Sequence, residues 1–356
     1  MNATTVPPRA QELSEGDLGR VLEYLERGDT STAATLLAGA VAGGVSTGAN
    51  ASLFHGAPAV EFVLGRAGRP RPQVERAVDA VVAARLWAAR RRQASAALAL
   101  PAEWDLIRGL TGLGALLLAR PAPSPLLGQV LSQLVRLAEP VPTPHGPLPG
   151  WWSPRGPHDE EHPGGHSNNG LAHGIAGPLA LLSLALRQGQ QVPGQQRAIA
   201  AFAHWLRTHG HRYWTLREHL AAPAPPPKGG RPSWCYGQAG IARALQLAAL
   251  ALDDASLQEQ AEDTLERTLT DPAALGAITD ASLCHGWAGL VVLTRAVAAD
   301  SPTPHRFTPL LTDLTGRLAA TADDLPKPGF LEGRSGARLA LHGTDTTAWT
   351  RALLLT

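Results

Sequence analysis

Charge of one sign, long apolar runs and cysteine are all scarce in this chain of 356 residues. The formal net charge is only +1, and lysine and arginine form no extended cluster. Both observations argue against nucleic acid as the main partner. No run of 18 uninterrupted apolar residues is present, which rules against a transmembrane segment. The start of the chain also lacks the charged residues and apolar core of a secretory signal, so we expect a cytoplasmic protein.

Disulfide and β-sheet signals are weak as well. The two cysteines, Cys235 and Cys284, do not make a disulfide framework in a chain of this length. They could form a single bridge, remain buried thiols or bind a metal. Aromatic residues make up only 5% of the chain and β-branched runs are few, whereas alanine and leucine are abundant. This composition predicts an all-α fold.

What the chain has instead is a repeat. Six times, a short polar or aromatic stretch leads into a Gly-x-x-Gly step, or a near relative of it, and then into a small apolar helix. The spacing varies from 47 residues between the last two copies to 65 between the second and third. Each copy predicts one helical hairpin. The leading glycines are Gly56, Gly109, Gly174, Gly237, Gly286 and Gly333.

Amphipathic helices are predicted between the glycine motifs. Each has a single apolar stripe, which indicates an outer layer, whereas the helices after the glycine motifs are poor in charge and indicate an inner layer. The motif stays fixed while the spacing varies, which favours a closed ring over an open solenoid with capped ends. We therefore predict one domain over residues 1–356, an α/α toroid with a double ring of inner and outer helices. The amphipathic segments cover residues 74–82, 126–137, 199–206, 257–269 and 310–318.

Three segments do not follow the repeat. Residues 139–169 and 221–233 are rich in proline and glycine, so we expect irregular loops there. Each leads directly into a glycine motif, which predicts that both lie near the mouth of the ring. Residues 1–15 are expected to be disordered, as chain ends often are.

The two cysteines occupy equivalent positions in two copies of the motif. Cys235 lies in Trp-Cys-Tyr-Gly, and Cys284 lies in Leu-Cys-His-Gly with His285 beside it. Zinc prefers thiolate and imidazole ligands, and a catalytic zinc site has three protein ligands and one open position. The alternative is a pair of buried thiols with a capping histidine. The equivalent positions of the cysteines favour the zinc site.

Other residues near the glycine motifs could take part in acid–base chemistry. His173 has the position in its repeat that His285 has in another, and His55 has it in a third. His173 is either a satisfied histidine at a helix start or a general acid or base. Asp105 is either a helix N-cap or a carboxylate that orients an imidazole. Arg231 is either a solvated loop residue or a group that stabilises developing negative charge.

A run of three acidic residues raises a different possibility. Asp159, Glu160 and Glu161 could form part of a glycosidase site, which needs two acids that flank the glycosidic bond. A charged run in a loop rich in proline and glycine is more often simply solvated. We favour the solvated loop.

Several of these motifs occur together in one order. They are Asp105 before Gly-Leu-Thr-Gly, the run Asn168-Asn-Gly-Leu-Ala-His-Gly, and the motifs that begin at Trp234, Leu283 and Phe330. This combination resembles the lanthipeptide cyclase (LanC) family over nearly the whole chain. The resemblance implies an α/α toroid with one zinc ion at one end of the ring, held by Cys235, Cys284 and His285. It also implies catalytic roles for His173, Asp105, Arg231 and Tyr236. The chain departs from the family pattern in the first of the six repeats, at Pro58 and Ala59, and in the last, at Arg334, Ser335 and Arg338.

The resemblance also implies a reaction and its partners. Cysteine thiols of a peptide would add to dehydroalanine or dehydrobutyrine and form lanthionine-type thioether rings. Zinc would keep the substrate thiol deprotonated, and His173, oriented by Asp105, would give the α-carbon its proton. Arg231 or Tyr236 would stabilise the enolate or assist that transfer. The implied partners are a dehydrated precursor peptide, a dehydratase and a transporter complex, through which the protein could also associate with a membrane.

Two other functions fit parts of the sequence. A non-catalytic protein of the same fold could use a zinc–thiol site to bind glutathione or a peptide, or could serve in assembly. A prenyltransferase-like alkylator would need an aspartate ligand and an aromatic-lined cavity, and the sequence indicates neither. The natural-looking start and the length favour a free-standing cyclase over part of a larger synthetase.

Overall fold

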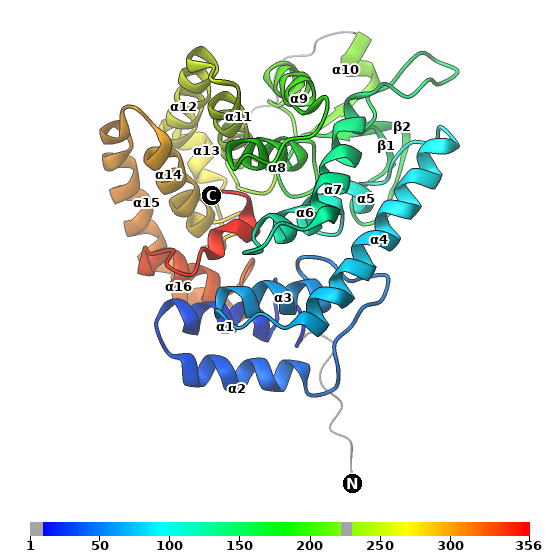
Figure 1. Ribbon diagram of the computed structural model, residues 1–356. Coiled ribbons are helices and arrows are strands. Elements are labelled where there is room, and N and C mark those ends of the chain that lie inside the picture. The colour runs from blue at the N-terminus through cyan, green and yellow to red at the C-terminus, as the bar shows by residue number, and fades with distance from the viewer. Residues whose placement is uncertain (1–9, 222–229) are drawn as a thin grey trace. The chain divides into compact units, whose positions relative to one another are not determined.

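The computed structural model describes residues 10–221 and 230–356 (Figure 1). These residues form mostly helices, and the chain divides into two compact units. Unit 1 combines residues 1–81 with residues 278–356, and unit 2 comprises residues 82–277. The single domain that the sequence predicts stays a prediction, because each unit is compact by itself. Within the described residues, no helix has both the length and the hydropathy that a membrane span needs.

A helix follows each of the six glycine motifs, as the repeat predicts. The side chains of these helices are mostly buried, because alanine, leucine and glycine leave most of them little polar face, whereas α16 also carries the exposed Arg338 and His342. They are therefore the helices predicted for an inner layer. Their bounds are Ala57–Arg66 (α3), Leu110–Leu118 (α6), Ala176–Arg187 (α8), Gln238–Leu252 (α11), Trp287–Asp300 (α14) and Arg334–His342 (α16).

Close backbone approach at the helix start requires the two glycines of the motif before α11. At Gly237, a Cβ atom would collide with the backbone nitrogen of Ser233, four residues earlier in the same turn. The N–H of Gly237 donates to the Ser233 carbonyl at 3.0 Å and closes this turn. At Gly240, a Cβ atom would collide with the carbonyl oxygen of Trp234. Glycine lets both approaches occur because it has no side chain.

The five amphipathic helices predicted between the motifs are also present. In four cases the amphipathic helix packs on the buried helix that precedes it: α7 on α6, α9 on α8, α12 on α11 and α15 on α14. This pairing confirms the two layers of helices. The bounds are Pro72–Ala94 (α4), Pro125–Val135 (α7), Gln195–His209 (α9), Ala255–Thr270 (α12) and Thr308–Thr321 (α15).

A seventh copy of the motif lies near the start of the chain. It begins at Leu13, reads Leu-Ser-Glu-Gly-Asp-Leu-Gly and leads into α1 (Asp17–Glu26). Leu13 is fully buried, and its N–H donates to the Phe54 carbonyl at 2.9 Å. The expected disorder is therefore wrong for residues 10–15, because backbone bonds and burial hold them. Residues 1–9 lie outside the described part of the chain.

Within unit 1, the first and last repeats of the chain are neighbours. The helix α1 packs against both α16 and α3, and α2 (Thr30–Val41) packs on α1. The N–H of Leu331, in the motif before α16, donates to the carbonyl of Ser14, in the motif before α1, at 2.9 Å. An open solenoid keeps its two end repeats apart. The adjacency of the two end repeats therefore supports the closed arrangement.

Within unit 2, the buried helix α8 packs against both α6 and α11. The three motif loops that precede these helices are thereby brought together at one end of the unit. Short elements complete the two units: α5 (Pro101–Trp104), α10 (Arg217–Ala221), α13 (Pro272–Gly276), and the 3₁₀ turns Arg136–Ala138, Pro304–Phe307, Ala322–Asp324 and Trp349–Leu353.

The sequence predicts an irregular loop over residues 139–169, but the structure contains a β-hairpin there. β1 (Ser153–Arg155) and β2 (Glu161–Asn168) pair antiparallel, and β3 (Trp214–Leu216) adds a third strand beside β2. The sequence does not predict this sheet because β2 lies between β1 and β3, and β3 is far along the chain. The second expected loop, residues 221–233, lies mostly outside the described residues.

Candidate functional site

Two backbone hydrogen bonds join the three motif loops of unit 2. The N–H of Leu106 donates to the Ala172 carbonyl at 3.1 Å, and the N–H of Ala172 donates to the Cys235 carbonyl at 3.1 Å. Asp105 and His173 are the chain neighbours of the first two of these residues. The folded backbone therefore brings together candidates that lie far apart in the sequence.

Asp105 and His173 form the most direct contact of the site. Oδ2 of Asp105 lies 2.6 Å from Nδ1 of His173, and the carboxylate side chain is only 1% exposed while the imidazole is 14% exposed. An ionised carboxylate accepts hydrogen bonds, so Nδ1 carries the proton in this pair. The nitrogen left for chemistry is then Nε2. The contact fixes both the tautomer and the orientation of the ring.

The second oxygen of Asp105 holds the start of α6. Oδ1 accepts the backbone N–H of Arg108 at 2.7 Å and that of Gly109 at 2.9 Å. These are groups that a helix start leaves without partners. Asp105 thus combines the two functions that the sequence offers as alternatives, because one oxygen caps the turn and the other holds an imidazole.

Tyr236 and Arg231 lie on the loop that precedes α11. The Tyr236 ring is 6.0 Å from the His173 ring between centroids, at an interplanar angle of 30°. Tyr213 stacks beside Tyr236 at 5.9 Å, and its hydroxyl donates to the Arg231 carbonyl at 2.9 Å. Burial raises the pKa of Tyr213, which keeps the phenol protonated for this bond. The structure therefore places Tyr236 beside His173, and the hydrogen bond from Tyr213 holds the main chain of Arg231.

Cys235 is almost completely buried at the start of α11. Its exposed fraction is 6%, and its Sγ lies 3.4 Å from Oγ of Ser233. The same Ser233 oxygen accepts the N–H of Tyr236 at 3.3 Å and that of Gly237 at 3.1 Å. The thiol therefore sits in a turn with fixed geometry at the N-terminus of α11.

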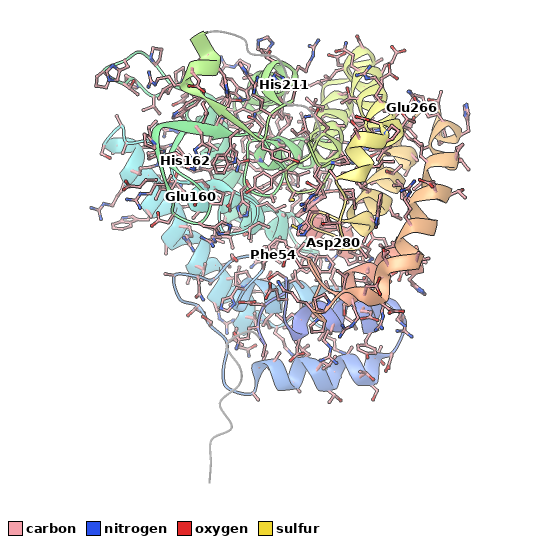
Figure 2. All side chains as sticks on the ribbon, turned by 180° about the vertical axis from the view of Figure 1, so that it is seen from behind. Phe54, Glu160, His162, His211, Glu266 and Asp280 are labelled. Carbon is pink, nitrogen blue, oxygen red and sulfur yellow. The ribbon has the colours of Figure 1, made fainter. Side chains whose placement is uncertain are left out.

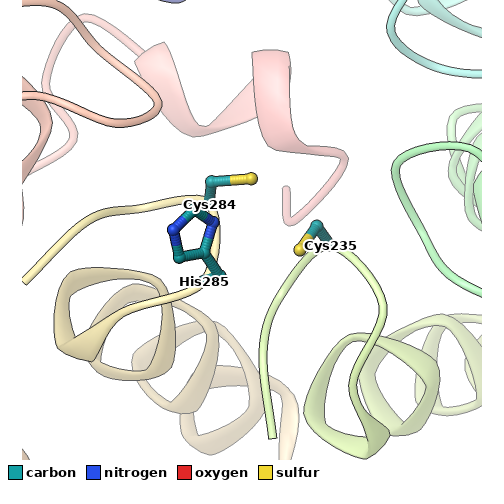
Figure 3. A group of neighbouring side chains, drawn as sticks. All are labelled: Cys235, Cys284 and His285. Carbon is teal, nitrogen blue, oxygen red and sulfur yellow. The ribbon is translucent and has the colours of Figure 1, made fainter. Parts of the chain in front are cut away.

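Cys284 and His285 lie side by side in the turn before α14 of unit 1 (Figure 3). The N–H of Cys284 donates to the Leu331 carbonyl at 2.9 Å, which fixes the loop against the last repeat. Nε2 of His285 lies 3.0 Å from Oδ2 of Asp280. Because Nε2 is engaged there, Nδ1 is the nitrogen available to a metal.

Asp280 (Figure 2) is a neighbour of His285 that the sequence does not single out. Its Oδ1 accepts the N–H of Ser282 at 2.8 Å, while Oδ2 holds His285. Burial raises the pKa of Asp280, but the hydrogen bonds from His285 and Ser282 outweigh that effect and keep the pKa well below its usual range. No repeated pattern marks it, because the residue five before His173 is Asn168.

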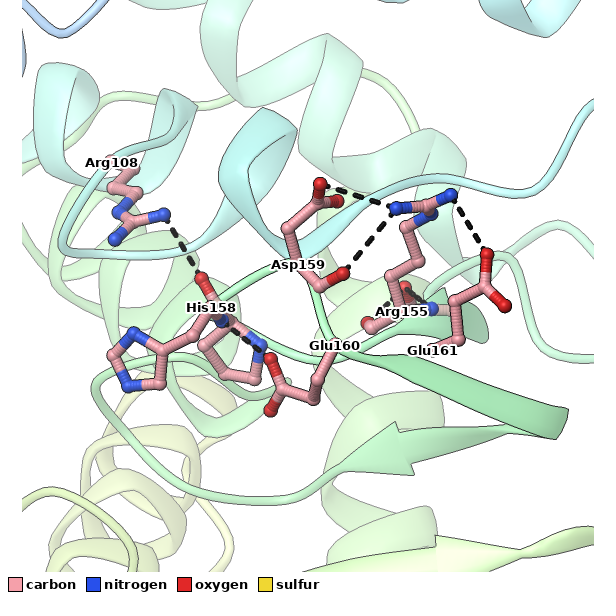
Figure 4. Close-up of polar contacts among 8 residues, drawn as sticks. Arg108, Arg155, His158, Asp159, Glu160 and Glu161 are labelled. Carbon is pink, nitrogen blue, oxygen red and sulfur yellow. Dashed lines mark hydrogen bonds and ion pairs between the residues drawn. The ribbon is translucent and has the colours of Figure 1, made fainter.

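The three acidic residues of the β1–β2 hairpin are not arranged as a glycosidase pair (Figure 4). Asp159 and Glu161 are exposed, and both pair with Arg155 at 3.1 Å. Glu160 instead accepts the backbone N–H of His158 at 2.8 Å. Each carboxylate is used to shape the hairpin, which agrees with the solvated loop.

The likeness to known proteins covers almost the whole chain. The sequence model of the family described as lanthionine synthetase C-like protein matches residues 10–354. The nisin biosynthesis protein NisC of Lactococcus lactis subsp. lactis is 27% identical over 214 residues, which are 55% of this chain and only 50% of that protein. The solved structure of nisin cyclase superposes with a TM-score of 0.80 at 20% identity, covering 98% of this chain and 93% of that one. The structural likeness shows the fold, the α/α toroid predicted from the sequence.

Proposed function

Because the chain belongs to the lanthionine synthetase C-like family, we propose that it is a zinc-dependent cyclase. In this proposal, cysteine thiols of a dehydrated precursor peptide add to dehydroalanine or dehydrobutyrine and close thioether rings. The supporting observation is the donor set Cys235, Cys284 and His285, whose ligand atoms all lie within 4.8 Å of one another (Figure 3).

The donor set fits zinc in its chemistry. Two thiolates and one imidazole are typical zinc ligands, and three protein ligands leave a place for the sulfur of a substrate. His285 also has the partner that metal-binding histidines usually have, because its other ring nitrogen is held by the carboxylate of Asp280. Zinc, when bound, lowers the pKa of a coordinated thiol and so supplies a nucleophilic thiolate at neutral pH.

The protein residues of unit 2 would handle the proton that the reaction requires. The new C–S bond forms as the C=C electrons move into an enolate, and the α-carbon then takes a proton. His173 gives that proton from Nε2, and the buried carboxylate of Asp105 stabilises the imidazolium before the transfer. The phenol of Tyr236, beside the His173 ring, would donate to the enolate oxygen, and Arg231 on the same loop would stabilise its charge.

The metal assignment is tested by metal analysis of purified variants. We expect about one zinc per chain in the unaltered protein, in agreement with a single three-ligand site, and less than about a tenth of that in Cys284→Ala. His55→Ala is the matched control, because His55 has the motif position of His285 in a repeat without cysteine. Full zinc content in Cys284→Ala would contradict the ligand set.

The activity is tested with a dehydrated precursor peptide and mass spectrometry after thiol alkylation. Each ring closed removes one alkylatable thiol. We expect His173→Ala to keep its zinc and to lose ring closure or its stereochemical control. A non-catalytic zinc–thiol binding protein would instead bind the peptide and leave every thiol alkylatable, which would overturn the proposal.

We further propose that the protein works in the cytoplasm next to a dehydratase. The dehydrated residues are the electrophiles of the reaction, so a dehydrating enzyme must act on the peptide first. Co-purification of a tagged dehydratase from the same cells, with and without a transporter, tests this partnership. Separate elution of the two proteins in the presence of precursor peptide would contradict it.

A further inference from the structure

We propose that His158, at the tip of the β1–β2 hairpin, relays protons between solvent and His173. This inference rests on the proposed function, in which His173 loses one proton in each ring closure. It assigns a role to a segment that the sequence predicts to be an irregular loop.

The tip that carries His158 has a defined conformation (Figure 4). The N–H of Gly156 donates to the Glu160 carbonyl at 2.8 Å, and Asp159 adopts a φ of +67° between them. The side chain of Glu160 accepts the backbone N–H of His158 at 2.8 Å. The backbone of His158 is therefore fixed although its side chain is exposed.

A chain of contacts connects this tip to the Asp105–His173 pair. The guanidinium of Arg108 donates to the Pro157 carbonyl at 3.0 Å (Figure 4). The backbone N–H of the same Arg108 donates to Asp105, whose other oxygen holds His173. One carboxylate thus orders both the imidazole and the residue that anchors the hairpin tip.

The result is a pair of imidazoles with different access to water. The ring centroids of His158 and His173 lie 6.5 Å apart at an interplanar angle of 61°. A rotation of the exposed ring or one bridging water spans such a gap, which is within the reach of proton transfer. His173 itself is only 14% exposed and has its Nδ1 on Asp105.

The reaction needs such a path because its protons must balance. The substrate thiol loses one proton on becoming a thiolate, and the α-carbon gains one from His173. Protonated His158 would then pass its proton to neutral His173 and recover one from buffer, so no net proton is consumed. An imidazole can do both because it titrates near neutral pH.

The groups near the two rings are themselves held by hydrogen bonds. Asp105 and Glu160 are carboxylates, and the cation Arg108 is engaged with the hairpin backbone. The ring of Tyr236 lies beside that of His173. The two carboxylates thus hold the His173 ring and the His158 backbone in place.

The test compares His158→Gln with Asp159→Asn, a matched control at the same hairpin tip. Asn tolerates the positive φ of residue 159, and neither exposed side chain contributes to the core. In dilute buffer of bulky ions, we expect His158→Gln to lower kcat about tenfold with KM unchanged. Added imidazole should restore the rate, and Asp159→Asn should behave as the unaltered protein.

A second readout does not depend on activity. In the zinc-loaded protein, NMR of ¹⁵N-labelled histidine gives the exchange rate of the His173 ring proton with water. We expect this exchange to be several-fold slower in His158→Gln and unchanged in Asp159→Asn. If the unaltered protein closed no rings, the proposed function would be wrong. The difference in exchange rate between the unaltered protein and His158→Gln would still test the relay.

Two results would overturn the relay. The first is an unchanged rate of ring closure and of ring-proton exchange in His158→Gln. The second is a loss of activity that imidazole does not restore and that appears in KM, because His158 would then only position the hairpin.

Discussion

Replacing Asp105 separates its two functions. In Asp105→Asn, the amide oxygen can still accept the N–H groups of Arg108 and Gly109 as Oδ1 does now. The amide nitrogen, however, would donate towards Nδ1 of His173, where Oδ2 now accepts. The imidazole must then carry its proton on Nε2 in the neutral form, and its protonated form loses its partner. The cap should survive while the acid–base function fails.

The stability effect follows from the two backbone bonds. Asp105→Ala removes the side-chain acceptor of the Arg108 N–H and leaves the N–H of Gly109 only the Asp105 carbonyl, at 3.2 Å. A lost helix cap costs about 1–2 kcal/mol. We therefore expect Asp105→Ala to lower the free energy of unfolding by about 1–2 kcal/mol. Asp105→Asn should lower it by less than about 1 kcal/mol, because the oxygen is kept.

The activity effect follows from the bond to His173. A hydrogen bond to a charged group contributes about 1.5–3 kcal/mol, and about 1.4 kcal/mol corresponds to a tenfold change in rate. Without the carboxylate that stabilises the imidazolium, ring closure should therefore be about 10- to 150-fold slower in Asp105→Asn. Asp105→Ala should be at least as slow as Asp105→Asn.

Urea unfolding and the alkylation assay measure the two effects on the same preparations. The double variant Asp105→Asn/His173→Ala should be no slower than His173→Ala alone, because the carboxylate acts through the imidazole. Ring closure at the unaltered rate in Asp105→Asn would refute the proposed role. Equal destabilisation by Asn and Ala would refute the separation of the two functions.

Three further predictions concern stability and are measured by urea unfolding. Gly240→Ala should cost about 3 kcal/mol or more, because its Cβ would collide with the Trp234 carbonyl. Burial raises the pKa of Glu26, but hydrogen bonds from threonine side chains and backbone N–H groups outweigh that effect and lower the pKa to about 2. Its contribution, about 1 kcal/mol, should be present above pH 4.5 and be lost as pH falls towards 2. Burial lowers the pKa of His166 to about 4, so stability should fall by about 2 kcal/mol between pH 6.5 and 4.

Variants at the two titrating residues and two control variants check these predictions. Gly39→Ala, at a helical glycine whose Cβ would meet no atom, should stabilise by up to about 1 kcal/mol. Glu26→Gln and His166→Asn should flatten the pH dependence in the two windows, whereas the exposed His305 should give no change on replacement by Asn. An unaltered pH dependence in either buried variant, or a neutral Gly240→Ala, would contradict the argument.

The helices could be predicted from the sequence because their signals are local. A glycine motif and an apolar period of 3.6 each lie within a single segment, so the six buried helices and their amphipathic partners are found where expected. The seventh motif at Leu13 has the same glycine spacing, but its acidic residues and its place near the chain end resemble a disordered terminus. The sheet is not predicted from the sequence because its third strand, Trp214–Leu216, lies about 50 residues from the β-hairpin in the chain.

The candidate site could be predicted in part for the same reason. The metal-type residues Cys235, Cys284 and His285 are recognisable by residue type and by their equivalent motif positions. Asp280 and His158 have no such signal. Their places depend on how a turn folds back on its own helix and on how a distant hairpin meets a motif loop, and neither is encoded in a short pattern.

The repeated turn explains why the chemistry gathers at two positions. In the loops before α8, α11, α14 and α16, the residue two before the leading glycine takes part in the backbone hydrogen bonds between motif loops, and in two of these loops it is Cys235 or Cys284. The next residue is His173, Tyr236 or His285 in three repeats. In the end repeats of unit 1 the same position holds Glu15 and Glu332, which both bind Lys327, at 2.5 and 2.6 Å. The backbone of the turn is already fixed by its glycines and its interloop bonds. The residues at these two positions can therefore differ between repeats, forming a structural ion pair in one and serving as a metal ligand or an acid in another, without altering the fold.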